Sequence, residues 1–430
     1  MDLEDELDLE WFCPEPFTNI FTDTTGTYKS CCASKDMGYG VTTEHKTPKE
    51  ALNCAKAKRM RKAFLENDKE YLKDPCSVCI KQEQTGMKSH RQFYLDRFKQ
   101  KSEESDFVHK ALDMVKFVKE VRKDPDKDID PPFYHSMEFL AGGGNYCNLR
   151  CAMCAASCSS SYSKESYDLK EEQGMWHKAT FGKHKYQPPL DKRIDKEMDD
   201  ILPKLQEIKL TGGEPLAIPW NYKMLKRSVE LGAAQGQILR IITNGTMTPT
   251  NFNTNIFQLI PDFKKVYINV SIEAWGEKNN YIRYPSDFNV ILDNANRFAE
   301  NFNTEVTFCS TVNALNIGFM DEMITGARYA NEKFLKSVGN SYVTADNLTA
   351  MNVASVPYEI REQYLDRYYS MDVDLAKLMM PYIELLQEEN FNEKQCSILM
   401  KRMYDRDIYR GTNLLEHWPE WEPYYENLLR

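Results

Sequence analysis

The sequence predicts an α/β protein built on a parallel sheet, with a cysteine-rich segment before the sheet and helices after it. Two observations support this class. Short, partly β-branched apolar runs recur between residues 136 and 345, and most of them are separated by helix-like stretches. Strands that alternate with helices are typical of βαβ units, which place parallel strands in one sheet.

The expected strands are six short apolar runs. They cover 136–141, 207–211, 238–243, 266–272, 305–312 and, least regularly, 341–345. Helices are expected over 221–232 and 287–300. Six such units can form an open barrel or a doubly wound sheet, and in either case functional residues gather at the carboxyl ends of the strands.

The segments around the predicted sheet suggest three parts. An amphipathic helix is expected over about 104–121, followed by a charged, proline-containing linker with a boundary near Pro131. The stretch 164–197 has helical ends and a middle rich in Pro, Gly and His, so we expect a loop over one mouth of the sheet. Residues 359–430 are expected to be helical. The predicted domains are therefore 1–130, 131–358 and 359–430.

Composition restricts the environment and the partners. The formal net charge is −10, so nucleic acid is not expected as a partner. No run of about 18 apolar residues appears and the N-terminus is acidic, so we expect no membrane association and a cytoplasmic location. The 12 cysteines are then better explained as metal ligands than as disulfides, because cytosolic thiols stay reduced.

Three cysteines follow the first predicted strand, directly after a glycine run, in GGGNYCNLRCAMC (142–154). Cys147, Cys151 and Cys154 have the spacing C-x3-C-x2-C. Three thiolates leave one iron of a four-iron cluster open, whereas a structural zinc needs a fourth ligand, which Cys158 could supply. The position at a strand's carboxyl end favours an open iron–sulfur site.

This loop resembles that of the S-adenosylmethionine (SAM) radical enzyme superfamily, with Met153 where the family often has an aromatic residue. A second segment, IKLTGGEPL (208–216), resembles the part of that family that holds the methionine ammonium group. It supplies Gly212, Gly213 and Glu214. The resemblance implies a partial (βα)6 barrel, SAM, and a SAM-binding 4Fe-4S cluster.

The resemblance also implies SAM contacts after the later strands. The family contacts the nucleoside side of SAM there, and it commonly pairs the SAM carboxylate with an arginine. In this sequence, these contacts fall on Thr243, Asn244, Ser271, Glu273, Arg283 and Asn313. Glu273 stands where the family's S-x-D pattern has Asp, which preserves the acceptor for ribose hydroxyls but adds a methylene.

A second group of cysteines precedes residue 80. Cys13, Cys31, Cys76 and Cys79 can close a four-thiolate cage, and spacing does not decide between zinc and iron–sulfur. The pattern resembles the SPASM/twitch accessory domain, which implies one auxiliary 4Fe-4S cluster. That domain usually follows the barrel, and here it precedes it. Cys32 could replace Cys31 as the ligand.

The resemblance implies an enzyme that cleaves SAM reductively to methionine and a 5'-deoxyadenosyl radical, which abstracts hydrogen from a substrate. A peptide or protein side chain is the first expectation for the substrate, and a small metabolite is the second. An electron donor such as a flavodoxin or ferredoxin is also expected. The alternative is a non-enzymatic zinc-binding interaction protein, which leaves the Gly-Gly-Glu segment and Arg283 unexplained.

Overall fold

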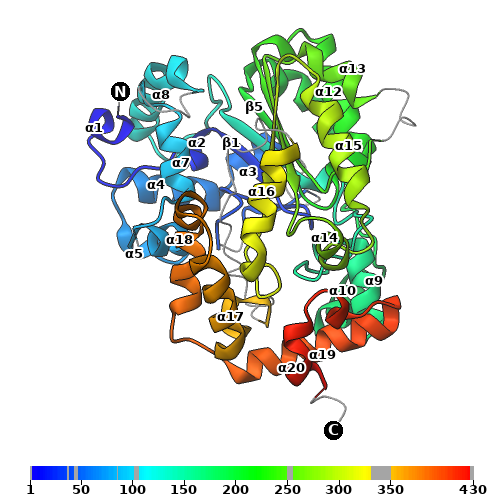
Figure 1. The fold of residues 1–430 in the computed structure, drawn as a ribbon. Helices are drawn as coiled ribbons and strands as arrows, with labels where there is room; N and C mark the ends of the chain where they lie inside the picture. Colours follow the sequence, from blue (N-terminus) through cyan, green and yellow to red (C-terminus); the bar gives the residue numbers. More distant parts are fainter. Residues whose placement is uncertain are drawn as a thin grey trace. The chain divides into compact units, whose positions relative to one another are not determined.

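The computed structural model describes residues 2–35, 38–42, 47–84, 86–100, 106–248, 255–330 and 350–426 (Figure 1). The strands are β1 (Asn19–Thr22), β2 (Thr27–Lys29), β3 (Gly40–Val41), β4 (Ser136–Phe139), β5 (Glu207–Leu210), β6 (Ile238–Thr243), β7 (Lys265–Ser271) and β8 (Thr304–Cys309). The expected strand over 341–345 lies outside the described residues.

Helices make up most of the remaining regular structure. In the N-terminal third they are α1 (Leu3–Leu7), α2 (Glu15–Thr18), α3 (Pro48–Leu52), α4 (Ala55–Leu65), α5 (Lys69–Leu72), α6 (Ser77–Gln84), α7 (His90–Asp96) and α8 (Ala111–Lys123). In the middle they are α9 (Ser160–Asp168), α10 (Glu172–Phe181), α11 (Lys192–Ile201), α12 (Pro219–Glu230), α13 (Ile256–Leu259), α14 (Glu277–Ile282), α15 (Phe288–Ala299) and α16 (Met320–Ala330). The C-terminal helices are α17 (Tyr358–Tyr369), α18 (Val373–Gln387), α19 (Glu393–Arg410) and α20 (Glu422–Glu426).

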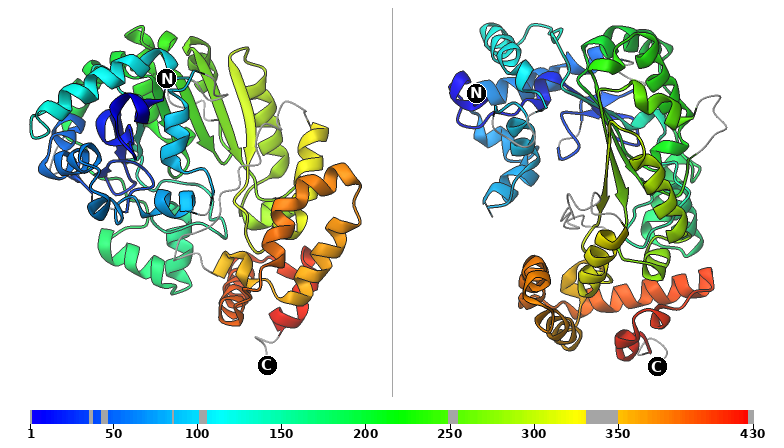
Figure 2. Two further views of the ribbon diagram at one scale, coloured as in Figure 1. Left: turned by 90° about the vertical axis from the view of Figure 1, so that its left-hand side faces the viewer. Right: turned by 45° about the horizontal axis from the view of Figure 1, so that its top comes forward.

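The chain divides into two compact units. The first unit contains Met1–Asn145, Tyr186–Ile241 and Thr250–Val266, and the second contains Tyr146–Lys185, Ile242–Pro249 and Tyr267–Arg430. In the first unit, helices α1 to α8 gather in one group, coloured blue to cyan in Figure 2. The domain boundaries expected from the sequence stay a prediction.

The strands form a sheet in the order β3-β2-β1-β4-β5-β6-β7-β8. The pairs β1–β4, β4–β5 and β5–β6 are parallel, and β1–β2 and β2–β3 are antiparallel. Strands β4 to β8 are neighbours in chain order, as in a barrel built from successive βα units, whereas a doubly wound sheet reverses its order at a switch point. The predicted α/β class and the mainly parallel sheet are confirmed.

Burial differs between the strands of the sheet: every residue of β1 and β4 is buried, whereas burial alternates along β7. In β7, Val266, Ile268 and Val270 are fully buried, and the residues between them are partly exposed. This period of two places every second side chain in the core. The carboxyl ends of these strands carry most of the predicted SAM residues.

The structure corrects part of the expectation for 164–197: residues 182–191 are not helical, but 172–181 form a helix where a loop was expected. This helix, α10, packs beside α9 (Figure 1). Its Gly174 allows this packing, because a Cβ there would overlap the backbone of Tyr167. The glycine that suggested a loop therefore serves close contact between two helices.

The C-terminal segment is helical, as predicted. Helices α17 and α18 pack against each other, and α19 ends at Gly411, which has a left-handed conformation. Across the described residues, the helices are too short or too polar to cross a membrane.

Candidate metal centres

The loop from Cys147 to Cys154 belongs to the second unit and brings its three thiols together. Cys147 and Cys151 are 8% and 7% exposed, and Cys154 is half-buried. Burial, together with the neighbouring thiols of Cys158, Cys151 and Cys147, raises the pKa of Cys154 well above its ordinary value. Closely spaced thiolates repel one another, which keeps their thiols protonated. Bound metal ions would remove this repulsion, because they replace the protons of the thiols.

Hydrogen-bond donors point at the sulfur of Cys147. The backbone N–H of Leu149 lies 3.4 Å from its Sγ, and Asn244 Nδ2 lies 3.8 Å from it. Asn244 is held in place because its Oδ1 accepts from the Thr246 backbone N–H at 2.9 Å. N–H donors to sulfur tune the potential of iron–sulfur clusters, so these residues fit such a group.

Helix α9 fixes the same loop from its N-terminus. The hydroxyl of Ser159 donates to the carbonyl of Leu149 at 2.5 Å, and that of Ser161 donates to the carbonyl of Cys147 at 2.8 Å. Ser159 also accepts from the backbone N–H of Tyr162 and so caps the helix. The serine-rich run after the cysteines therefore anchors their loop.

Glu273 and Arg283, both predicted to contact SAM, form an ion pair with each other at 2.8 Å. Glu273 also accepts from the backbone N–H of Thr311 at 2.8 Å and from Ser310 at 3.3 Å. Burial raises the pKa of Glu273 to about 7, although Arg283 opposes the shift. Within the described part of the chain, Nε of Arg283 is buried without a hydrogen-bond partner.

Other predicted SAM residues shape turns at strand ends. Thr243 Oγ1 accepts from the Gly245 backbone N–H at 3.1 Å. Asn313 is fully buried, and its side chain accepts from the Leu315 N–H and donates to the Thr311 carbonyl. Ser271 is the last residue of β7 and is half-buried. Their assignment to SAM stays a prediction.

The Gly-Gly-Glu segment lies in the first unit, directly after β5. Gly212 has φ +103°, a left-handed conformation that favours glycine. The carboxylate of Glu214 is fully buried and accepts from the Leu216 backbone N–H at 3.0 Å. Gly144, before the cysteine loop, also has positive φ, and a Cβ there would overlap the carbonyl of Tyr186.

The four N-terminal cysteines predicted as ligands line one cavity in the first unit. This cavity has about 360 Å³ of empty space, part of it open to solvent. Its thiols are those of Cys13, Cys31, Cys76 and Cys79. Burial, Glu15 and the thiols of Cys76 and Cys79 raise the pKa of Cys13 well above its ordinary value. Four soft donors around one space fit a metal centre.

His90 and Glu15 join this cavity, and the sequence analysis missed both. The ligand atoms of Glu15, Cys31 and His90 all lie within 4.8 Å of one another. Glu15 is 2% exposed and also contacts His135 at 2.6 Å. Burial alone would raise its pKa, but hydrogen bonds from His135 and His90 lower it to about 2. The sequence feature that could have indicated Glu15 is its position two residues after Cys13.

The remaining N-terminal cysteines have other surroundings. Cys32 is exposed, and its Sγ faces His90 Nε2 at 3.8 Å. Cys54 is half-buried, with its Sγ 3.5 Å from the carbonyl of Tyr39. Because Cys31 lines the cavity, the geometry favours Cys31 over Cys32 as the ligand.

Part of the chain matches a known protein family. Residues 143–324 match the model described as the radical SAM superfamily. The matched stretch contains the cysteine loop and the strands that follow it. A radical SAM domain implies SAM and a four-iron cluster as cofactors, and the match supports an enzyme. No curated protein matches the chain.

Two solved structures are similar in part. One is Streptococcus suis SuiB bound to S-adenosylmethionine, with 14% identity, a TM-score of 0.32, and coverage of 57% of this chain and 51% of that chain. The other is Streptococcus suis SuiB, with 12% identity, a TM-score of 0.32, and coverage of 69% and 63%. The chain thus spans between 51% and 63% of the length of these structures.

Proposed function

The chain contains a radical SAM domain, and on this premise we propose that it cleaves SAM reductively at a four-iron cluster bound by Cys147, Cys151 and Cys154. The observation that carries the proposal is the loop geometry. Three thiols share one short loop, and N–H groups of Leu149 and Asn244 are directed at one of them. A loop without a role in metal binding would not need N–H groups that donate to a cysteine sulfur.

The protein's own residues hold and orient the reactants. When bound, the cluster supplies the electron that breaks the sulfonium C–S bond of SAM. Arg283 would hold the SAM carboxylate, because its buried Nε still has donor capacity. Glu273 is occupied by protein donors, so we assign it to the orientation of Arg283 and not to ribose. The assignment of Gly212, Gly213 and Glu214 to the amino group of SAM stays a prediction from the sequence.

Hydrogen abstraction from a bound substrate would follow the cleavage of SAM. We propose a peptide or protein side chain as the substrate, with a small metabolite as the alternative. Support for a peptide comes from the resemblance of the N-terminal cysteine pattern to the accessory module of peptide-modifying relatives. An external electron donor of the flavodoxin or ferredoxin class would reduce the cluster.

The test is anaerobic reconstitution with iron and sulfide, then reduction in the presence of SAM. We expect wild-type protein to release 5'-deoxyadenosine and Cys151→Ala to release at least about 100-fold less, because the loop would lose a cluster ligand. Cys158→Ala is the matched control. Its thiol is exposed and lies next to the loop, and it should leave cleavage intact. Unchanged cleavage by Cys151→Ala contradicts the assignment.

We further propose that the N-terminal cavity holds an auxiliary four-iron cluster, bound by Cys13, Cys31, Cys76 and Cys79 in a SPASM/twitch-like arrangement. The supporting observation is the convergence of these four thiols on one cavity. With all four irons ligated by protein, the cluster would transfer electrons or stabilise the fold, and it would not bind substrate directly.

A single zinc ion is the second candidate for this cavity. Its support is the close spacing of Glu15, Cys31 and His90, with ligand atoms within 4.8 Å. Zinc–ligand bonds of about 2.0 to 2.3 Å place tetrahedral ligands this near to one another. A four-iron cluster has its irons between the ligands and therefore spreads them farther apart.

A further inference from the structure

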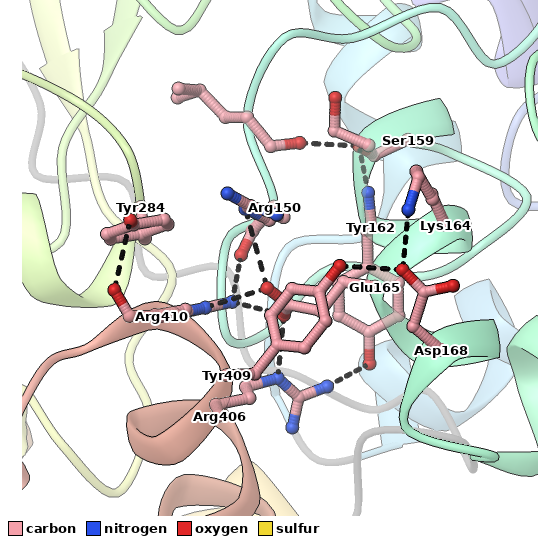
Figure 3. A network of polar contacts seen from close by, with 12 residues as sticks. Arg150, Ser159, Tyr162, Lys164, Glu165, Asp168, Tyr284, Arg406, Tyr409 and Arg410 are labelled. Atoms are coloured by element: carbon pink, nitrogen blue, oxygen red, sulfur yellow. Dashed lines mark hydrogen bonds and ion pairs between the residues drawn. The ribbon is translucent and has the colours of Figure 1, made fainter.

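The C-terminal helix α19 reaches the cysteine loop through a buried polar network in the second unit (Figure 3). At its centre is Glu165 of α9, which is fully buried. Arg410 donates to both of its oxygens, at 2.9 and 2.5 Å, and Arg406 donates to one at 3.2 Å. Two arginines from one turn of α19 thus share one carboxylate of α9.

Arg410 also contacts the backbone of the cysteine loop. The same Nη2 that donates to Glu165 also donates to the carbonyl of Arg150, at 2.7 Å. Arg150 is the residue before Cys151, so this bond holds the peptide group that leads into the ligand. The backbone N–H of Arg150 in turn donates to the Tyr284 carbonyl at 2.8 Å, which fixes the other side of that residue.

The surroundings of Glu165 carry an excess of positive charge. The guanidinium groups of Arg150, Arg406 and Arg410 face the carboxylates of Glu165 and Glu171. Arg410 is 2% exposed, so solvent screens its charge poorly. Three guanidinium groups thus face two carboxylates, which leaves part of this positive charge without a counter-charge.

We propose that Arg410 is a positioning residue for the SAM-binding cluster: it fixes the Arg150–Cys151 peptide and places a buried positive charge beside the carbonyl that leads into Cys151, so that α19 sets the reduction potential of the cluster. This inference rests on the proposed function. A reduced cluster carries one more negative charge than an oxidised one. A nearby buried cation therefore stabilises the reduced form and raises the potential.

The test is a redox titration of the reconstituted full chain, followed by electron paramagnetic resonance. The SAM-binding cluster is recognised because its signal changes when SAM is added. In Arg410→Gln, we expect the ratio of reduced to oxidised cluster to fall about tenfold at a fixed potential, which is about 59 mV for a one-electron couple. Lys401→Gln is the control, because Lys401 is an exposed cation of the same helix, paired with Asp405.

A second variant separates charge from geometry. Arg410→Lys keeps the cation but loses the planar fork that spans Glu165 and the Arg150 carbonyl. We expect it to keep the wild-type potential and to lose iron to a chelator several-fold faster. A wild-type potential in Arg410→Gln overturns the proposal, as does an equal fall in Lys401→Gln. If Arg410→Gln does not fold, a lowered potential in Arg410→Lys overturns it.

Failure of the proposed function gives a different result. In that case, the wild-type protein itself shows no reducible signal that responds to SAM. If the wild-type signal responds to SAM and Arg410→Gln has the wild-type potential, only the role of Arg410 is refuted.

Discussion

Glu273 shows how burial controls one carboxyl group at the candidate site. It is 2% exposed and receives hydrogen bonds from Arg283, Thr311 and Ser310. These donors favour the charged form, but loss of solvent disfavours it more, and the pKa rises to about 7. Because this residue orients Arg283, its charge state affects how firmly the guanidinium is held near neutral pH.

The raised pKa predicts a pH dependence of stability. The folded protein keeps a proton on Glu273 up to about pH 7, whereas the unfolded chain releases it near the ordinary glutamate pKa of 4.5. Glu273 therefore costs no stability below pH 4.5 and reduces stability as pH rises from 4.5 to 7. In Glu273→Gln, the free energy of unfolding should fall less across this window than in the wild type. The difference between the two falls should be about 3 kcal/mol at most.

Urea unfolding of the metal-free protein at several pH values measures this difference. Parallel profiles for the wild type and Glu273→Gln would show that Glu273 is ionised throughout.

The cysteine positions could be read from the sequence because ligand spacing is local. The pairing of Glu273 with Arg283 could not, because it depends on how the end of β7 meets the end of α14.

At the scale of elements, strands β4 to β8 were predicted and β1 to β3 were not. The later strands are apolar runs separated by helices, a pattern that needs no tertiary context. Strand β1 has only four residues and follows α2 without a turn signal, and it is stabilised by parallel pairing with β4. Helix α10 was missed for a similar reason, because Gly174 is explained only by its contact with α9.

The docking of α7 near β5 gives a prediction about a buried ion pair in the first unit. Arg97 directly follows α7, Glu207 begins β5, and both side chains are fully buried, 2.6 Å apart. Burial alone would raise the pKa of Glu207, but Arg97 lowers it to about 2. Glu207→Gln leaves Arg97 with only the partly exposed Asp106 as a counter-charge and should reduce the free energy of unfolding by about 3 kcal/mol.

The pH dependence of this pair has the opposite sign to that of Glu273. The depressed pKa means that Glu207 contributes stability above about pH 4.5, and this contribution is lost as pH falls towards 2. Urea unfolding should therefore show a smaller loss between pH 4.5 and pH 3 in Glu207→Gln than in wild type. The double variant Arg97→Met, Glu207→Leu is the control. It removes both charges and should recover part of the loss at pH 7.

At the scale of the molecule, the two candidate metal centres lie in separate compact units. The cavity of Cys13, Cys31, Cys76 and Cys79 belongs to the first, and the loop of Cys147, Cys151 and Cys154 belongs to the second. Each set uses ligands and hydrogen bonds from its own unit. Loss of one centre should therefore leave metal binding at the other intact.

Iron and zinc analysis of reconstituted protein tests this independence. Two four-iron clusters give about eight irons per chain, and Cys79→Ala should lower the count to about four, while reductive cleavage of SAM without substrate persists. Cys54→Ala is the control, because this thiol contacts the Tyr39 carbonyl and should leave about eight irons. About four irons and one zinc in the wild type would instead favour a zinc ion in the N-terminal cavity. Eight irons in Cys79→Ala would contradict the ligand assignment.

Full substrate turnover by a folded Cys79→Ala that has lost those four irons would exclude a redox role for the N-terminal centre, because electrons would then have another route.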